Sequence, residues 1–221
     1  MHDGAYDRYL STVRGLMEKV SKEEVEAAAA LLVETIKNDH LVYVLGTSGH
    51  AYMAAEEMFY RAGGLIPVCP IFPSGLALAH GAGRSAIVRR CQGYISKVLA
   101  YHALGEGDTL LLVDPDGVSP VAIEAALKAK EMGAKVVAIT ARECGKTIPL
   151  DSAARHPSGR NLCDLEAVDA LIDLKMPADD AVLSFPDCAA KVSPVSTVLY
   201  MFILNALVGC TVEQLLALGI E

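Results

Sequence analysis

Short, mainly apolar runs recur along the chain from residue 41 onward. Five of them are present, at Leu41–Leu45, Leu65–Val68, Leu110–Val113, Val136–Ile139 and Val168–Leu174. Stretches with helical spacing separate most of these runs. Strands that are apolar on both faces and alternate with helices are typical of a parallel sheet covered on both sides. The pattern therefore predicts an α/β fold, a three-layer αβα sandwich around a five-stranded parallel, flavodoxin-like sheet.

Helical spacing also dominates the N-terminal part of the chain. Apolar positions there recur three and four residues apart, and Ser21 with Glu24 forms a capping box that begins a second helix. We therefore expect an N-terminal helical hairpin over residues 1–40 and one α/β unit over residues 41–221. Within that unit, helices are predicted at Ala51–Ala62, Ala86–Leu104, Ser119–Met132 and Pro194–Val208, with a short one from Thr211.

Composition and charge narrow the class of protein. Apolar residues make up 52% and charged residues 21% of the 221 residues, which allows a large core and argues against disorder. The formal charge of −8 repels phosphate backbones, so we expect no nucleic-acid partner. No signal-peptide layout is present, and no run reaches the about 18 apolar residues of a membrane span. The six cysteines lack zinc-ligand spacing. We therefore expect a reduced, cytoplasmic protein with no membrane partner.

Polar loops after the strands mark the expected ligand site, because ligands bind beyond the carboxyl ends of the strands in an open parallel sheet. The loop after the first predicted strand consists of Gly46, Thr47, Ser48, Gly49 and His50. Glycine lets the backbone approach a ligand closely, and the hydroxyls can bond phosphate or sugar oxygens. A tight strand-to-helix turn would need the same glycines, but position and composition together favour ligand binding.

A second loop, after the run that ends at Val113, carries two carboxylates. Its polar residues are Asp114, Asp116 and Ser119, with Gly117 at the turn. Ser119 is suited to cap the helix that follows. The aspartates could bind a sugar hydroxyl or a metal, or act as a base, and they could equally be ordinary turn residues.

The order of these segments resembles the SIS (sugar isomerase) domain over residues 5–210. Three segments, AAEEMFYRAGGLIPV, ARHPSGRNLCDLEAVDALID and KVSPVSTV, further resemble a bacterial subgroup that takes its name from phosphoheptose isomerase. The resemblance implies a small-molecule site for a phosphosugar or related carbohydrate derivative, and a homodimer. It assigns ligand contacts to the first loop and to two residues before the last helix, Ser196 and Thr197. Those two hydroxyls could instead only cap the helix.

The second loop departs from the SIS pattern. The family usually reads Ser-x-Ser-Gly-x-Ser/Thr there, whereas this chain has Asp114 and Asp116 in place of two hydroxyls. An ionised carboxylate repels phosphate unless it is protonated or bridged by a cation, so the substitution argues against phosphate binding at this loop. A magnesium ion could bridge these carboxylates to a phosphate, but we assign no metal site and expect no cofactor.

An isomerase also needs a base that moves a proton between C1 and C2 of the sugar. Phosphoheptose isomerases use a glutamate on the helix after the first loop, and the corresponding position here is Tyr60, three residues beyond Glu57. We therefore take Glu57 and His50 as the candidate catalytic residues. Three functions stay open: an isomerase or lyase acting on a sugar phosphate, which we favour as an aldose–ketose isomerase, a non-catalytic sugar sensor, and an oligomeric scaffold.

Overall fold

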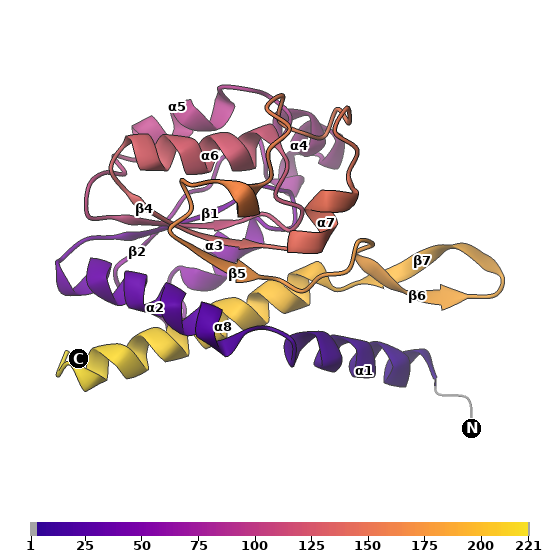
Figure 1. The fold of residues 1–221 in the computed structure, drawn as a ribbon, viewed down its shortest axis with the longest axis horizontal. Helices are drawn as coiled ribbons and strands as arrows, with labels where there is room; N and C mark the ends of the chain where they lie inside the picture. The colour runs from indigo at the N-terminus through magenta and orange to yellow at the C-terminus, as the bar shows by residue number, and fades with distance from the viewer. Residues whose placement is uncertain (1–3, 221) are drawn as a thin grey trace.

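Five parallel strands form the centre of the molecule in the computed structural model, which describes residues 4–220 (Figure 1). In spatial order the strands run β2-β1-β3-β4-β5. Their bounds are Val42–Gly46 for β1, Val68–Pro70 for β2, Thr109–Val113 for β3, Lys135–Thr140 for β4 and Ala170–Asp173 for β5. Every residue of β1 and β3 is buried, because helices cover both faces of the sheet. The predicted α/β class and five-stranded parallel sheet are confirmed.

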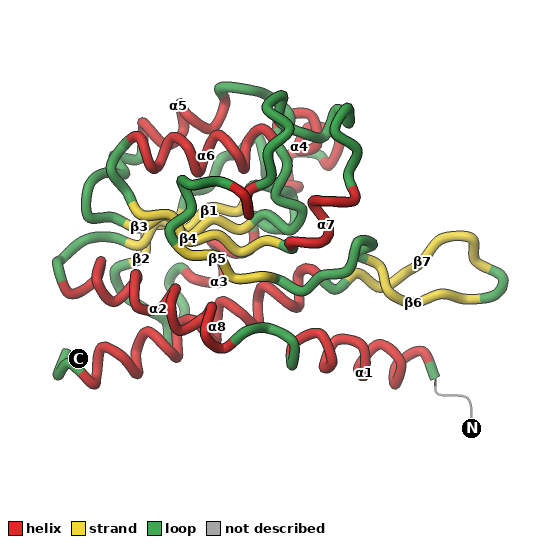
Figure 2. The backbone as a smooth tube through the Cα atoms, in the orientation of Figure 1, coloured by secondary structure: helices red, strands yellow, loops and turns green. Residues whose placement is uncertain are grey.

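Helices form the two outer layers (Figures 1 and 2). One core lies between the sheet and the helices α2, α3 and α8, and a second lies between the sheet and α5 and α6. Alternate strand residues enter alternate cores, as the two-residue period of a strand requires. The bounds are Lys22–Lys37 for α2, Met53–Met58 for α3, Tyr94–Tyr101 for α5, Pro120–Glu131 for α6 and Ser196–Ala217 for α8. Shorter segments are η1 (Leu78–His80), α4 (Ala82–Val88), α7 (Arg142–Thr147) and η2 (Leu162–Asp164).

The two predicted N-terminal helices are present, but they pack on different partners. α2 packs on α8 and the sheet, whereas α1 (Ala5–Met17) contacts α8 and the strand β6 (Ala181–Phe185). Ser21 caps α2 by accepting a hydrogen bond from the amide of Glu24, as predicted. The Glu24 carboxylate turns to the sheet and accepts from the amide of Asp173. This bond ties the start of α2 to the end of β5.

Two helices are shorter than the sequence pattern predicts. The stretch predicted as one helix over Ala86–Leu104 is divided into α4 and α5, and Gly93 between them takes a positive φ of 74°. Such a φ interrupts a right-handed helix and favours glycine. The helix predicted over Ala51–Ala62 ends as α3 at Met58, and Tyr60 just beyond it also has a positive φ.

α8 is one continuous helix of 22 residues rather than the two predicted helices. Thr211, where a new helix was expected to begin, instead donates to the carbonyl of Leu207 inside the helix. By length and composition α8 is apolar enough to cross a membrane, which the run of apolar residues alone did not indicate. However, Leu199, Tyr200 and Ile203 are buried in the core with α2 and α3. One face of α8 thus belongs to the core, whereas Phe202, Val212 and Leu216 on the same helix are exposed.

An antiparallel hairpin that sequence analysis did not predict projects from the body between β5 and α8 (Figure 1). It consists of β6 and β7 (Cys188–Pro194), and most residues of β7 are exposed. Because β7 buries so little, its sequence lacks the alternation of apolar and polar residues that marks a half-buried strand. α1 supports the hairpin, and the guanidinium of Arg8 lies 5.0 Å from the ring centre of Phe185.

Candidate functional site

The carboxyl ends of β1 and β3 lie next to each other, because their pairing sets Gly46 beside Val113. The loops after both strands therefore start side by side, where ligands bind in open parallel sheets. A cavity of about 290 Å³ opens at this point. Its lining consists of Ser48, His50, Arg89, Pro115, Asp116, Cys144, Ile148, Met176, Ala178, Asp180 and Ser196.

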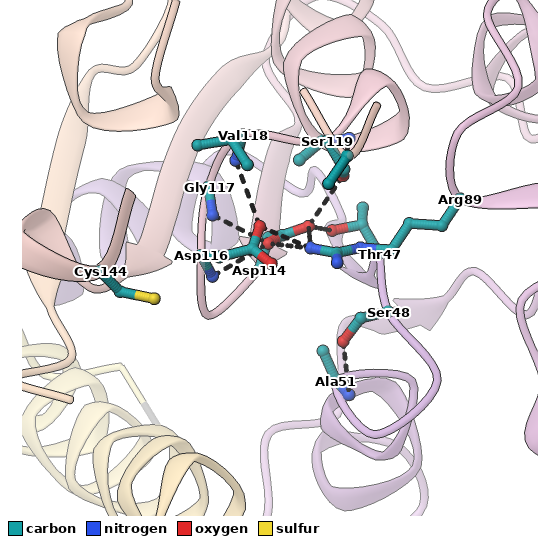
Figure 3. Close-up of polar contacts among 12 residues, drawn as sticks. Thr47, Ser48, Ala51, Arg89, Asp114, Asp116, Gly117, Val118, Ser119 and Cys144 are labelled. Atoms are coloured by element: carbon teal, nitrogen blue, oxygen red, sulfur yellow. Dashed lines mark hydrogen bonds and ion pairs between the residues drawn. The ribbon is translucent and has the colours of Figure 1, made fainter. Parts of the chain in front are cut away.

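Asp114 lies directly behind this cavity and is fully buried (Figure 3). Its Oδ2 accepts hydrogen bonds from the hydroxyls of Thr47 (2.5 Å) and Ser119 (3.1 Å). Its Oδ1 accepts from the backbone amides of Asp116 (3.2 Å) and Gly117 (2.9 Å). Successive amides of this kind form a concave anion site. The carboxylate of Asp114 therefore occupies the inside of the β3–α6 loop as an internal anion.

Arg89, just beyond the end of α4, joins the two aspartates of this loop (Figure 3). Its Nη2 lies 2.8 Å from Oδ1 of Asp114 and 2.6 Å from Oδ1 of Asp116. The guanidinium supplies positive charge to the fully buried carboxylate of Asp114 and to the partly buried carboxylate of Asp116. Sequence analysis did not anticipate Arg89, because its partners are 25 and 27 residues away and nothing in its local sequence indicates them.

The surroundings move the pKa values of the two aspartates in opposite directions. Burial alone would raise the pKa of Asp114, but the charge of Arg89 and the hydrogen bond from Thr47 hold it well below its ordinary value. Burial, followed by the charge of Asp114, raises the pKa of Asp116 to about 6 despite the contact with Arg89. Burial also raises the pKa of Cys144 to about 11, so this thiol is not poised as a nucleophile. The carboxyl group of Asp116 therefore exchanges its proton closer to neutral pH than an ordinary aspartate does.

The start of α8 forms another wall of the cavity. Asp180 accepts from the amides of Val195 and Ser196 and from the hydroxyl of Ser196, so its carboxylate caps this helix. Ser196 lines the cavity, as predicted for a ligand contact. Thr197 does not line it, and its hydroxyl lies 3.4 Å from that of Tyr200. Asp180 was not singled out from the sequence, because an aspartate ahead of a hairpin and a helix has no distinctive pattern.

The first predicted loop reaches the cavity through Ser48 and His50. Within residues 4–220, no hydrogen bond has the amide of Ser48, Gly49 or His50 as its donor. Of these three residues, Ser48 and His50 line the cavity. Gly46 has a packing role, since a Cβ there would overlap the backbone carbonyl of Ala51. Thr47 points away from the lining, to the buried carboxylate already described.

Comparison with known proteins places the chain in a family. Residues 8–141 match the SIS-domain family model, which is more than half of the chain. A UPF0309 protein of Geobacillus kaustophilus is 36% identical over 218 residues, 97% of this chain and 84% of that relative. A UPF0309 protein of Brucella anthropi is also 36% identical, over 217 residues, 98% of this chain and 85% of that relative. The chain belongs to the UPF0309 family of SIS-domain proteins.

Solved structures share the fold of this UPF0309 protein. A phosphoheptose isomerase from Neisseria gonorrhoeae aligns with a TM-score of 0.61 and 19% identity, over 93% of this chain and 94% of that one. A phosphoheptose isomerase from Francisella tularensis aligns with the same TM-score and 15% identity, over 96% of this chain and 100% of that one. The SIS resemblance predicted from the sequence is confirmed, and at these identities the likeness concerns the fold.

Glu57, one of the two predicted catalytic residues of this UPF0309 protein, does not line the cavity. Its carboxylate accepts from the side-chain amide of Asn205 at 2.9 Å and pairs with Arg61 at 3.0 Å. The first of these bonds links α3 to α8. A catalytic role for Glu57 stays a prediction, and its partners favour a structural role. His50, the other candidate, does line the cavity.

Proposed function

We propose that this protein binds a carbohydrate derivative in the cavity beside β1 and β3 and interconverts its aldose and ketose forms. The carboxyl group of Asp116 carries the proposal, because it lines the cavity and its pKa is raised to about 6. Isomerisation of this kind needs a base whose pKa lies near the working pH. Proteins of the same fold that are named phosphoheptose isomerases support the choice of reaction.

Asp116 is proposed to take the proton from C2 of the open-chain aldose and to return it to C1 of the resulting enediol. A second proton moves from O2 to O1 in the same conversion, so atoms and charge balance. Arg89 is a positioning residue, since its Nη2 holds one oxygen of Asp116 at 2.6 Å. His50, exposed at the edge of the cavity, is the candidate for the hydroxyl proton.

Asp116→Asn should lower the rate of proton exchange at C2 by about 10²–10⁴-fold, the usual contribution of a general base. The wild-type rate should rise with pH through about 6, because only the ionised carboxylate can accept a proton. Aldoses of five to seven carbons, free and as terminal phosphate esters, are incubated in D₂O. Loss of the C2 proton signal is then followed by ¹H NMR.

Asp151→Asn is the matched control, since Asp151 is exposed in the loop after α7 and outside the cavity lining. It should leave the exchange rate unchanged. A substrate whose exchange is the same in wild type and Asp116→Asn would rule out Asp116 as the base. Sugar binding without any exchange would support the non-catalytic sensor instead.

We also propose that two copies associate through the outer face of α8. Phe202, Val212 and Leu216 are exposed on this helix, although a helix that is apolar all round is normally buried. An apolar groove of about 210 Å³ lies beside it and includes Ile66, which is 96% exposed. A second copy would cover the same surface on both chains by twofold symmetry, which is the commonest arrangement of homo-oligomers.

Phe202→Glu combined with Leu216→Glu should convert this dimer to a monomer, because each dimer would then bury four carboxylates in an apolar interface. Sedimentation equilibrium measures the mass directly. Leu150→Glu, at an exposed site on a distant loop, is the control and should leave the dimer intact. A wild-type protein that sediments as a monomer at high concentration would contradict the proposal.

We further propose the cytoplasm as the compartment. All six cysteines are free thiols, and two of them, Cys91 and Cys188, are exposed. Exposed thiols persist in a reducing compartment, whereas secreted proteins commonly pair their cysteines as disulfides. The free thiols therefore agree with the compartment expected from the sequence.

A further inference from the structure

On the basis of the proposed function, we infer that the carbohydrate bound in this cavity carries no phosphate group. The site is built to take a neutral sugar through its hydroxyls. Besides the unpaired amides of Ser48 and His50, two places in the cavity wall have the form of an anion site: the concave β3–α6 loop and the start of α8. In both places the chain's own carboxylates occupy the donors.

The β3–α6 loop has no free donor for a phosphate. The amides of Asp116 and Gly117 and the hydroxyl of Ser119 all bond the carboxylate of Asp114. The amide of Val118 bonds Oδ1 of Asp116 at 3.3 Å. A phosphate could enter this loop only by displacing a carboxylate that is fully buried behind it.

The start of α8 is occupied in the same way. A helix N-terminus offers unpaired amides and a partial positive charge, both favourable to anions. Here the amides of Val195 and Ser196 bond Oδ1 of Asp180 at 2.9 and 2.7 Å, and the Ser196 hydroxyl bonds Oδ2 at 2.8 Å. Asp180 therefore takes the amides of Val195 and Ser196 and adds its own negative charge to the lining.

The balance of charge also opposes phosphate. Among residues 4–220, Arg89 is the only lysine or arginine in the cavity lining, and it is already shared between Asp114 and Asp116. Asp180 adds a third carboxyl group on the opposite wall. A phosphate would add negative charge to a site that has one guanidinium for three carboxyl groups, and like charges repel strongly away from bulk water.

A sugar hydroxyl, by contrast, matches what the site leaves available. Oδ2 of Asp116 accepts no hydrogen bond from any of residues 4–220, and a hydroxyl can donate to it. The amides of Ser48, Gly49 and His50 have no acceptor, and a hydroxyl oxygen can accept from them as well. The cavity of about 290 Å³ lies at the small end of the range for ligand pockets, about 300–1,000 Å³, which suits a single sugar unit.

A thermal-shift comparison of matched ligand pairs tests this inference. The probes are fructose, ribose and N-acetylglucosamine, each beside its own terminal phosphate ester, together with inorganic phosphate, all at constant ionic strength. A free sugar near saturation should raise Tm by about 5 °C or more, and its ester should raise it less. Inorganic phosphate should give no shift with the wild-type protein.

Asp116→Ser restores a hydroxyl in the loop and releases Arg89 from one carboxylate, so this variant should gain stabilisation by inorganic phosphate. Asp151→Ser removes the same charge from an exposed site and should behave as wild type. A wild-type protein stabilised more by an ester than by its parent sugar would overturn the inference and leave the proposed function intact. If neither sugars nor esters shift Tm, the proposed function fails, and this inference fails with it.

Discussion

Replacing Asp114 by asparagine should lower the free energy of unfolding by about 3–5 kcal/mol at neutral pH. Losses of this size are usual when one partner of a buried ion pair is removed, and Asp116 is then the one carboxylate still paired with Arg89. Asparagine keeps one acceptor oxygen but turns an N–H group toward the hydroxyls of Thr47 and Ser119. Those hydroxyls can rotate to accept. The negative charge opposite Arg89 cannot be replaced.

The dependence of this loss on pH is a sharper test than its size. The pKa of Asp114 is lower in the folded protein than in the unfolded chain, where it is about 4. The stabilisation is therefore present above about pH 4 and is lost as the pH falls below it. Chemical denaturation of wild type and variant at pH 7 and pH 3 should show the difference shrink in acid. Asp151→Asn should stay within about 0.5 kcal/mol of wild type, and equal stabilities at pH 7 would contradict the prediction.

Arg89→Met should also lower the free energy of unfolding by about 3–5 kcal/mol at neutral pH, but this variant should respond to acid in the opposite way. Methionine keeps the apolar stem and leaves the buried Asp114 and the partly buried Asp116 without a counter-charge. Their pKa values in the folded variant then rise above those of the unfolded chain. Such groups destabilise when ionised, so this variant should gain stability as the pH falls from neutral toward about 4.

A second substitution distinguishes two possible causes of the destabilisation by Arg89→Met: the loss of the guanidinium charge and the loss of packing around the side chain. Adding Asp116→Asn to Arg89→Met removes one of the unpaired carboxylates, so the double variant should be more stable than Arg89→Met alone. Urea denaturation at pH 7 measures the order of stabilities. Arg90→Met is the control, since this neighbouring arginine is exposed. Further destabilisation by Asp116→Asn would mean that repulsion between the carboxylates does not dominate.

The sheet could be predicted from the sequence because its signals are local. β1 and β3 are buried along their whole length, and their sequences are almost wholly apolar. The caps were equally visible: Ser119 accepts from the amide of Ala122 at the start of α6, just as Ser21 caps α2. Where the prediction was wrong, a single backbone position decided the outcome. The left-handed conformation of Gly93 is one example, and a run of helix-compatible residues conceals it.

The two polar loops of the candidate site could be predicted, but not the way its charges are compensated. Both loops were identified because each follows an apolar run predicted to be a strand, and the structure sets those two strands side by side. Arg89 and Asp180 were not predicted because their roles depend on partners that only the folded chain brings near. The β6–β7 hairpin was not predicted from the sequence for a different reason. It has little buried surface, and so it leaves little pattern in the sequence.

The hairpin leaves the body and rejoins it at one point, since Asp180 before β6 bonds Ser196 at the start of α8, 16 residues later. This bond joins the two ends of the hairpin at its base. It holds Asp180 and Ser196 together in the wall of the cavity. The segment from Ala181 to Pro194 can therefore change in length or sequence without moving the wall of the cavity. In the evolution of such a chain, this is a place where new recognition elements can be gained or lost while the pocket is inherited unchanged.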